Sequence, residues 1–241
     1  MSNRLLDRQV RLLDYLTSGA VIFDDMREVS PDDALAGIDC GLLRLEARFS
    51  YQKRMQKIAA VFPRTFDVLN GHADAMIRDF VNSYPPRDIG RLENARQFHD
   101  FLCASRERFA HLPPFLCDVA ACELAYAQVR AGDGTRSAGK DAPPNAIRRD
   151  PRVVLLRCSH DVRPIFETGL PRGDPVARET LVGVAVPAGA DQPRMFELLP
   201  LVFDLLSAMD GWIDPTAILA TPKLNALIRD LSTAGLIEVR T

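Results

Sequence analysis

Residues 181–199 read LVGVAVPAGADQPRMFELL. Two apolar runs, Leu181–Val186 and Met195–Leu199, lie on either side of a turn at Gly189–Pro193. Aliphatic and β-branched runs that are bounded by glycine and proline predict a pair of strands joined by a turn. This pair decides the fold class, because it adds β structure to a chain whose other patterns are mostly helical.

Two helices and an apolar tail follow the strands. The first helix runs into Gly211, the second spans Pro222–Ala234, and the apolar tail Leu236–Val239 follows Gly235. Strand, turn, strand, helix and helix in this order are typical of a small winged-helix-like module.

The charge of this module disfavours DNA. From Leu181 onward it carries four basic and seven acidic residues, a net charge of −3. A DNA-binding module of this shape needs lysine and arginine to displace counterions from phosphates. The sequence therefore favours a peptide ligand over nucleic acid. Residues 44–108, by contrast, hold twelve basic and eight acidic residues. This charge could steer an acidic partner, but a solvated helix surface is the favoured explanation.

The first half of the chain repeats apolar residues at helical spacing. Proline and glycine separate these repeats and set the ends of the helices. The predicted helices are Leu5–Thr17, Leu42–Val61, Thr65–Leu69, His72–Ser83, Arg91–Ser105 and Phe115–Arg130.

Residues 131–150 mark a predicted domain boundary. They read AGDGTRSAGKDAPPNAIRRD, with glycine, proline and charge but no periodicity, which is typical of a linker. Beyond them the pattern changes to strands, beginning with Val153–Leu156. The sequence thus predicts an α+β fold, mostly α: a helical bundle at 1–130, a linker, and the winged-helix-like module at 151–241.

Signatures of catalysis and metal binding are missing from the sequence. It has no phosphate-binding glycine loop, no helix with paired zinc-binding histidines and no nucleophile elbow. Cys117 and Cys122 lack the two-residue gap of a zinc-binding pair, so we expect them to pack. We therefore predict no catalytic residue, no metal ligand and no cofactor on this chain.

The expected location is the cytoplasm. The sequence shows no secretion signal and no apolar run of the ~20 residues that span a bilayer. Its five cysteines are an odd number, which fits reduced thiols. We expect no contact with a membrane.

The segment Arg157–Phe166 places several ionisable groups directly after a predicted strand. A cysteine close to a histidine can form a reactive thiolate, and Cys158 and His160 share one face if the strand continues. The mixed charged and apolar character around Pro164 nevertheless favours a loop that docks on a partner. The predicted partner interface comprises Arg157, His160, Asp161, Arg163 and Phe166.

Short motifs follow one another through the helical half and the loop after it. They are Tyr51-Gln52-Lys53-Arg54, Phe62-Pro63, Leu69-Asn70-Gly71, Tyr84-Pro85-Pro86, Phe98 with Phe101-Leu102, Leu116–Ala120 with Glu123, and His160–Phe166. In this order they resemble the helical domain, long described as DNA-binding, that is encoded beside iron-dependent peptide-modifying oxidases. Within that group the chain resembles the MbnC-type subunits of methanobactin biosynthesis. Its tail is similar to the PqqD-like domains that recognise precursor peptides.

This resemblance implies a heterodimer with an MbnB-like oxidase, which holds the iron and uses dioxygen. That oxidase converts cysteines of an MbnA-like precursor peptide into oxazolone and thioamide groups, which later bind copper. The chain itself is expected to bind the leader of the peptide and to donate no iron ligand.

A leader peptide can bind by adding a strand to the edge of a sheet. The expected edge is Arg194–Leu199, and the helix Pro222–Ala234 is expected to form the other wall of the groove. The alternative is that the apolar members of this set form the core of the module. The predicted peptide contacts are Arg194, Met195, Phe196, Glu197, Leu198, Leu224, Leu227, Ile228 and Leu231.

Two other functions compete with a peptide-binding subunit. A winged-helix regulator would bind DNA, with the basic helical half contacting phosphates. An independent thiol or metal enzyme would use Cys158, His160 and Asp161.

Overall fold

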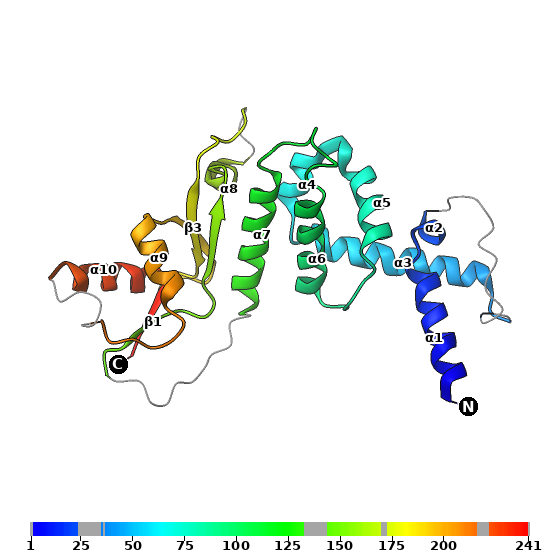
Figure 1. Ribbon diagram of the computed structural model, residues 1–241, viewed down its shortest axis with the longest axis horizontal. Helices are drawn as coiled ribbons and strands as arrows, with labels where there is room; N and C mark the ends of the chain where they lie inside the picture. The colour runs from blue at the N-terminus through cyan, green and yellow to red at the C-terminus, as the bar shows by residue number, and fades with distance from the viewer. Residues whose placement is uncertain are drawn as a thin grey trace. The chain divides into compact units, whose positions relative to one another are not determined.

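The structure, a computed structural model, describes residues 2–23, 35, 37–132, 144–169, 173–215 and 222–240. The chain divides into two compact units, Met1–Leu112 and Pro113–Thr241 (Figure 1). Helix predominates, and the strands form one three-stranded and one two-stranded sheet. The predicted class, α+β and mostly α, is confirmed.

The first unit consists of helices, as the apolar periodicity predicts. Asp39 caps α3 (Cys40–Ala59), because its carboxylate accepts hydrogen bonds from the N–H groups of Gly41 and Leu42 at 2.7 and 3.2 Å. Pro63 occupies the first turn of the next helix, where its missing N–H costs nothing. The other elements are α1 (Ser2–Thr17), α2 (Gly19–Ile22), α4 (Pro63–Leu69), the 3-10 helix η2 (Asn70–His72), α5 (Ala73–Ser83) and α6 (Arg91–Ala104).

Aromatic rings form the centre of the first unit and enclose one arginine. Phe62, Phe80 and Phe98 are fully buried, and the ring centroid of Phe98 lies 5.5 and 5.2 Å from those of Phe62 and Phe80. The guanidinium of Arg54 lies 4.4 Å from the Phe80 centroid, and burial lowers the pKa of Arg54 to about 10. Its N–H groups donate to Asn94 Oδ1, Gln97 Oε1 and the Tyr84 carbonyl.

The second unit has the order of elements that the quoted stretch predicts. This part comprises β3 (Thr180–Ala185), β4 (Arg194–Glu197), α9 (Pro200–Ala208), α10 (Pro222–Thr233) and β5 (Ile237–Val239). The elements that precede it are α7 (Leu116–Ala131), β1 (Ile147–Arg149), β2 (Val154–Cys158) and α8 (Arg163–Thr168).

Helices cover both faces of the antiparallel sheet β2–β3–β4. Neighbouring residues of a strand point to opposite faces. Cys158 of β2 contacts Cys122 of α7, with 4.0 Å between the sulfur atoms. The guanidinium of Arg157 instead lies 5.4 Å from the ring centroid of Phe203 in α9. α7 and α9 therefore pack on opposite faces (Figure 1).

The core of the second unit lies on the α9 face of the sheet. Leu198, Leu206, Leu231 and Leu236 are buried in it. Gly183 of β3 lies under this core, since a Cβ at that position would come within 3.1 Å of the Leu198 and Leu236 side chains. The glycine inside the predicted strand thus marks a place of close packing.

The domain boundary differs from the predicted one. The predicted helical domain extends to residue 130, but α7 packs on β2 and β3, and the division falls between Leu112 and Pro113. β1 lies inside the predicted linker 131–150 and pairs with β5, with Ile147 opposite Val239. A strand of three residues is too short to show a period, so no sequence pattern indicates it. Residues 133–143 of that linker lie outside the described part.

No helix in the described part of the chain is long and apolar enough to cross a membrane.

Candidate peptide-binding edge

β4 lies at an edge of its sheet, as predicted from the sequence. It pairs antiparallel with β3, with Glu197 opposite Val182, and no other described strand pairs with it. The N–H of Leu198 donates to the Leu181 carbonyl at 2.8 Å. Every second residue of β4, counted back from Leu198, therefore directs its backbone N–H and C=O groups toward β3. In this alternation, the N–H and C=O groups of Met195 and Glu197 point to the open side.

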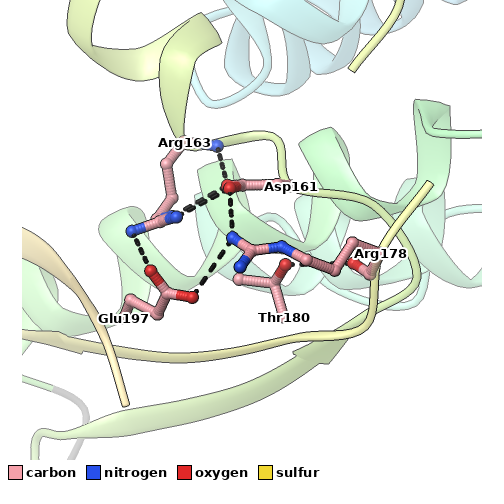
Figure 2. A network of polar contacts seen from close by, with 5 residues as sticks. All are labelled: Asp161, Arg163, Arg178, Thr180 and Glu197. Carbon is pink, nitrogen blue, oxygen red and sulfur yellow. Dashed lines mark hydrogen bonds and ion pairs between the residues drawn. The ribbon is translucent and has the colours of Figure 1, made fainter. Parts of the chain in front are cut away.

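The Glu197 carboxylate joins this edge to a network of ion pairs (Figure 2). One of its oxygens accepts from Arg163 Nη1 at 2.7 Å, and the other lies 3.2 Å from Arg178 Nη2. Both arginines also bind Asp161, so the network links two cations with two carboxylates. Its formal charge is therefore balanced.

Asp161 is the most enclosed carboxylate of the network, with a side chain only 14% exposed. It accepts from Nε and Nη2 of Arg163 at 2.8 and 2.6 Å and from Nη2 of Arg178 at 2.7 Å. The hydrogen bond from Arg163 is the largest cause that lowers the pKa of Asp161 to about 2, against a smaller opposing effect of burial. Asp161 thus remains ionised at neutral pH and holds both arginines beside β4.

The start of α8 and two hydrogen bonds to backbone carbonyls hold Asp161, Arg163 and Arg178 in place. Arg163 is the first residue of α8, with Pro164 in its first turn. The N–H of Asp161 donates to the Val176 carbonyl at 2.9 Å and fixes the approach to β3. Thr180 Oγ1 then donates to the Arg178 carbonyl at 3.0 Å, which orients the arginine at the start of β3 (Figure 2).

A second polar group joins α7 to the loop after β2. The carboxylate of Asp118, in the first turn of α7, accepts from the backbone N–H groups of Ser159 and His160, both at 3.1 Å. His160 Nδ1 lies 2.9 Å from the same carboxylate. The loop is therefore held against α7 by three contacts to one side chain.

The three groups of the competing enzyme hypothesis have separate partners. Cys158 faces the thiol of Cys122, and that hydrogen bond together with burial raises the pKa of Cys122. His160 faces Asp118, and Asp161 faces two arginines. The described structure does not bring Cys158, His160 and Asp161 together as a nucleophile, base and orienting acid.

The predicted peptide contacts differ in exposure. Leu198 and Leu231 are buried in the core of the module, as the alternative explanation of the sequence expects. The side chain of Leu224 lies outside the described residues. Phe196, Leu227 and Ile228 are half-buried and pack against the same core, which again fits the alternative explanation. Arg194 and Glu197 are exposed, and Met195 is half-buried.

The predicted partner interface is largely engaged within the chain. Arg157 is 56% exposed and pairs with Glu179, whereas His160 is buried. Phe166 is half-buried and stacks on Tyr126, with 5.6 Å between ring centroids. Asp161 and Arg163 belong to the network at β4. Contact of this segment with a partner stays a prediction.

No sequence pattern assigns a role to Arg178 or to Asp118. Arg178 lies in a stretch before β3 that has neither a motif nor a period, and its partners are 17 and 19 residues away. Asp118 is 42 residues from His160. An acidic residue in the first turn of a helix is a common stabilising choice, so Asp118 carries no specific signal.

The described residues contain no group of three or more side chains suited to hold a metal ion. Searches against protein-family models and curated proteins find no match to this chain.

Proposed function

We propose that this chain is a non-catalytic subunit that binds the leader of a ribosomally made precursor peptide. In this proposal it forms a heterodimer with an iron-dependent, dioxygen-using oxidase. The oxidase converts cysteines of the peptide into oxazolone and thioamide groups in methanobactin biosynthesis, in the cytoplasm. The resemblance described above suggests the identity of the oxidase and of the product.

The open side of β4 is the observation that carries the peptide-binding part of this proposal. On that side the N–H and C=O groups of Met195 and Glu197 pair with no described strand, and an added peptide strand would bond to them. Phe196 directs its side chain to the opposite face from Met195 and Glu197. A bound strand would therefore meet apolar groups on one face and the ion-pair network on the other.

Two further observations favour a peptide at this edge. Leu199, which precedes α9, and Leu201, in the first turn of α9, are 72% and 76% exposed. They offer apolar contacts to an extended ligand. The net charge of −3 from Leu181 onward disfavours the DNA-binding alternative.

A backbone substitution tests this part of the proposal. Met195→Pro removes an N–H that points away from β3, so it leaves the ladder within the sheet intact. We expect the affinity for a fluorescent leader peptide, measured by anisotropy, to fall about tenfold or more, since both a hydrogen bond and the space for it are lost.

Met195→Ala is the matched control, because it shortens the side chain and keeps the N–H. Its affinity is expected to stay within about threefold of the wild type. Equal affinity of the proline and alanine variants would show that β4 is not the binding edge. Thermal melts of both variants check that the unit remains folded.

Reconstitution tests the remaining part of the proposal. The oxidase should modify the peptide only when this chain is present, and the two proteins should elute together in size-exclusion chromatography. An oxidase that works fully alone would contradict the proposed role.

A further inference from the structure

Two buried cysteines of the second unit meet between a helix and the sheet. Cys122 of α7 and Cys158 of β2 are 0% and 2% exposed, and 4.0 Å separates their sulfur atoms. The two residues are 36 positions apart in the sequence, so tertiary packing brings the thiols together. The proposed function makes no use of either thiol, and this contact is therefore a separate feature of the fold.

A second contact holds the same two segments in register. Asp118 lies one turn before Cys122 in α7. Its carboxylate accepts hydrogen bonds from the N–H groups of Ser159 and His160, both at 3.1 Å. These two residues directly follow Cys158. Because Asp118 fixes α7 to the end of β2, the sulfur atoms of Cys122 and Cys158 are held opposite each other.

A third cysteine, Cys117, lies on the same helix but on another side of it. It precedes Cys122 by five residues, which is about 140° around a helix with about 3.6 residues per turn. Its side chain therefore leaves α7 in a different direction from that of Cys122, which faces β2. The packing of α7 thus selects Cys122, and not Cys117, as the neighbour of Cys158.

Two thiols in this arrangement can join in a disulfide when an oxidant accepts their electrons. The disulfide carries no charge and no polar hydrogen, so it suits a fully buried site. A pair of thiolates would instead place negative charge in the interior, beside Asp118 and Glu123. The oxidised form that fits this site is therefore a disulfide.

The burial of the thiols restricts the reaction to a chain that is still folding. The attacking species in thiol–disulfide exchange is the thiolate. The hydrogen bond with Cys158, together with burial, raises the pKa of Cys122, so the folded chain holds Cys122 as a thiol that reagents do not reach. Before α7 packs on β2, both side chains are open to solvent and can exchange.

We propose that Cys122 and Cys158 form a disulfide when the chain folds in the presence of a small disulfide, such as oxidised glutathione, and that this bond locks α7 onto the sheet. The thiolate of one cysteine attacks a sulfur of the small disulfide, whose S–S bond breaks and releases one small thiol. The thiolate of the other cysteine then attacks the protein sulfur of this mixed disulfide and releases the second small thiol. The two cysteines lose two electrons and two protons, which leave with the two small thiols.

The burial that excludes reagents from the thiols also protects the disulfide. A reducing thiol cannot reach the bond while α7 covers the sheet, so the chain keeps the redox state in which it folded. The bond closes a loop of 36 residues, which restricts the unfolded chain and stabilises the second unit. This redox-dependent lock does not depend on the proposed function, because both cysteines belong to the second unit itself.

Refolding of the full chain tests the proposal. The chain is unfolded in urea and diluted either into reduced glutathione alone or into a mixture with oxidised glutathione, and free thiols are then blocked. Mass spectrometry of a digest should show a Cys122–Cys158 cross-link only after refolding with oxidised glutathione. The oxidised chain should melt roughly 10 °C above the reduced chain when the fluorescence of Trp212, in the second unit, reports unfolding.

The rate of reduction tests the protection of the bond. A small thiol should cleave the cross-link at least about a hundredfold faster in the urea-unfolded chain than in the folded chain, since only opening of α7 exposes it.

Single substitutions identify the thiols that are responsible. Cys122→Ala and Cys158→Ala each remove one of them, and neither variant should melt higher after refolding with oxidised glutathione than after refolding without it. This comparison within one variant cancels any cost of the substitution itself. Cys117→Ser is the matched control on the same helix, and it should keep both the cross-link and the rise in melting temperature.

The two parts of the proposal have separate refuting outcomes. Recovery of Cys122 and Cys158 as free thiols or glutathione adducts, or a cross-link through Cys117 instead, would overturn the pairing. A Cys122–Cys158 cross-link that leaves the melting temperature unchanged, or that a small thiol cleaves equally fast in the folded chain, would overturn the lock.

Discussion

The Asp161 carboxylate is expected to stabilise the second unit in a measurable, pH-dependent way. Its pKa falls from 3.8 to about 2 on folding, chiefly because Arg163 donates to it. One pKa unit corresponds to about 1.4 kcal/mol, so the shift amounts to about 2 kcal/mol of stability at neutral pH. The side chains of Arg178 and Glu197 are 51% and 41% exposed, so water screens their contribution to this stability. We therefore expect the Asp161 carboxylate to stabilise the folded unit by about 1.5 kcal/mol.

Asp161→Asn removes the charge and keeps the size of the side chain. The assay is urea unfolding followed by the fluorescence of Trp212, the single tryptophan of the chain, which lies in the second unit. The guanidinium of Arg148 lies 4.5 Å from the Trp212 ring, so loss of this packing changes the signal. At pH 7 the unfolding midpoint should fall by about 1 M urea.

The pH dependence follows from the direction of the shift. A carboxyl group whose pKa is lower in the folded state stabilises the protein above its unfolded pKa, and this contribution disappears as the pH falls from about 4 to about 2. The wild type should therefore lose its advantage over Asp161→Asn across that range.

Glu179→Gln provides the control, because it breaks an ion pair with Arg157 whose side chains are 63% and 56% exposed. Exposed pairs contribute little, so its free energy of unfolding should stay within about 0.5 kcal/mol of the wild type. If Asp161→Asn proved equally harmless at pH 7, or kept its deficit at pH 2, the network would not stabilise the unit as we argue.

Two further predictions concern backbone space and thiol burial. Gly235 has φ +72°, and a Cβ there would lie 1.9 Å from a carbonyl oxygen, so Gly235→Ala should cost about 3 kcal/mol or more in the urea assay. Gly189→Ala, with φ +76° but no atom within 4 Å, should cost only about 1 kcal/mol, and equal costs would contradict the clash. In the folded chain Cys103 should react first with a thiol reagent, whereas Cys122 and Cys158 should react only after unfolding. Fast labelling of all five thiols in the folded chain would contradict the burial of Cys122 and Cys158.

The sequence predicts the elements that carry a long period or clear punctuation. α3, α5 and α6 follow from apolar spacing, and β3 and β4 follow from aliphatic runs around a turn. The helix α8, of six residues, and the strand β1, of three, are too short to show either signal. Their formation depends on partners that are distant in sequence, such as β5 for β1.

The domain boundary escaped prediction for a different reason. Local sequence defines α7 as a helix but not the unit on which it packs. The Cys122–Cys158 contact and the bonds from Asp118 to the loop after β2 tie α7 to the second unit. Those contacts depend on side chains 36 to 42 residues apart, which no local pattern relates.

The same limit applies to the candidate site. The hairpin of β3 and β4 could be predicted from two apolar runs around one turn, although a hairpin alone does not show which of its strands gains a further neighbour. The partners of Glu197 could not, since Arg163 and Arg178 approach it from α8 and from the segment before β3. The charges of Asp161 and Arg163, which suggested a docking loop, instead balance each other inside the unit.

This balance bears on how β4 would select a ligand. Two arginines and two carboxylates satisfy each other beside the strand, so the network adds no net charge to attract phosphates or an acidic chain. The network does not engage the backbone N–H and C=O groups of Met195 and Glu197, so these groups can pair with a ligand. Backbone pairing gives affinity to any extended peptide, and alternate side chains must then supply the specificity. Under the proposed function, the fit of the leader's side chains beside Phe196 would supply that specificity.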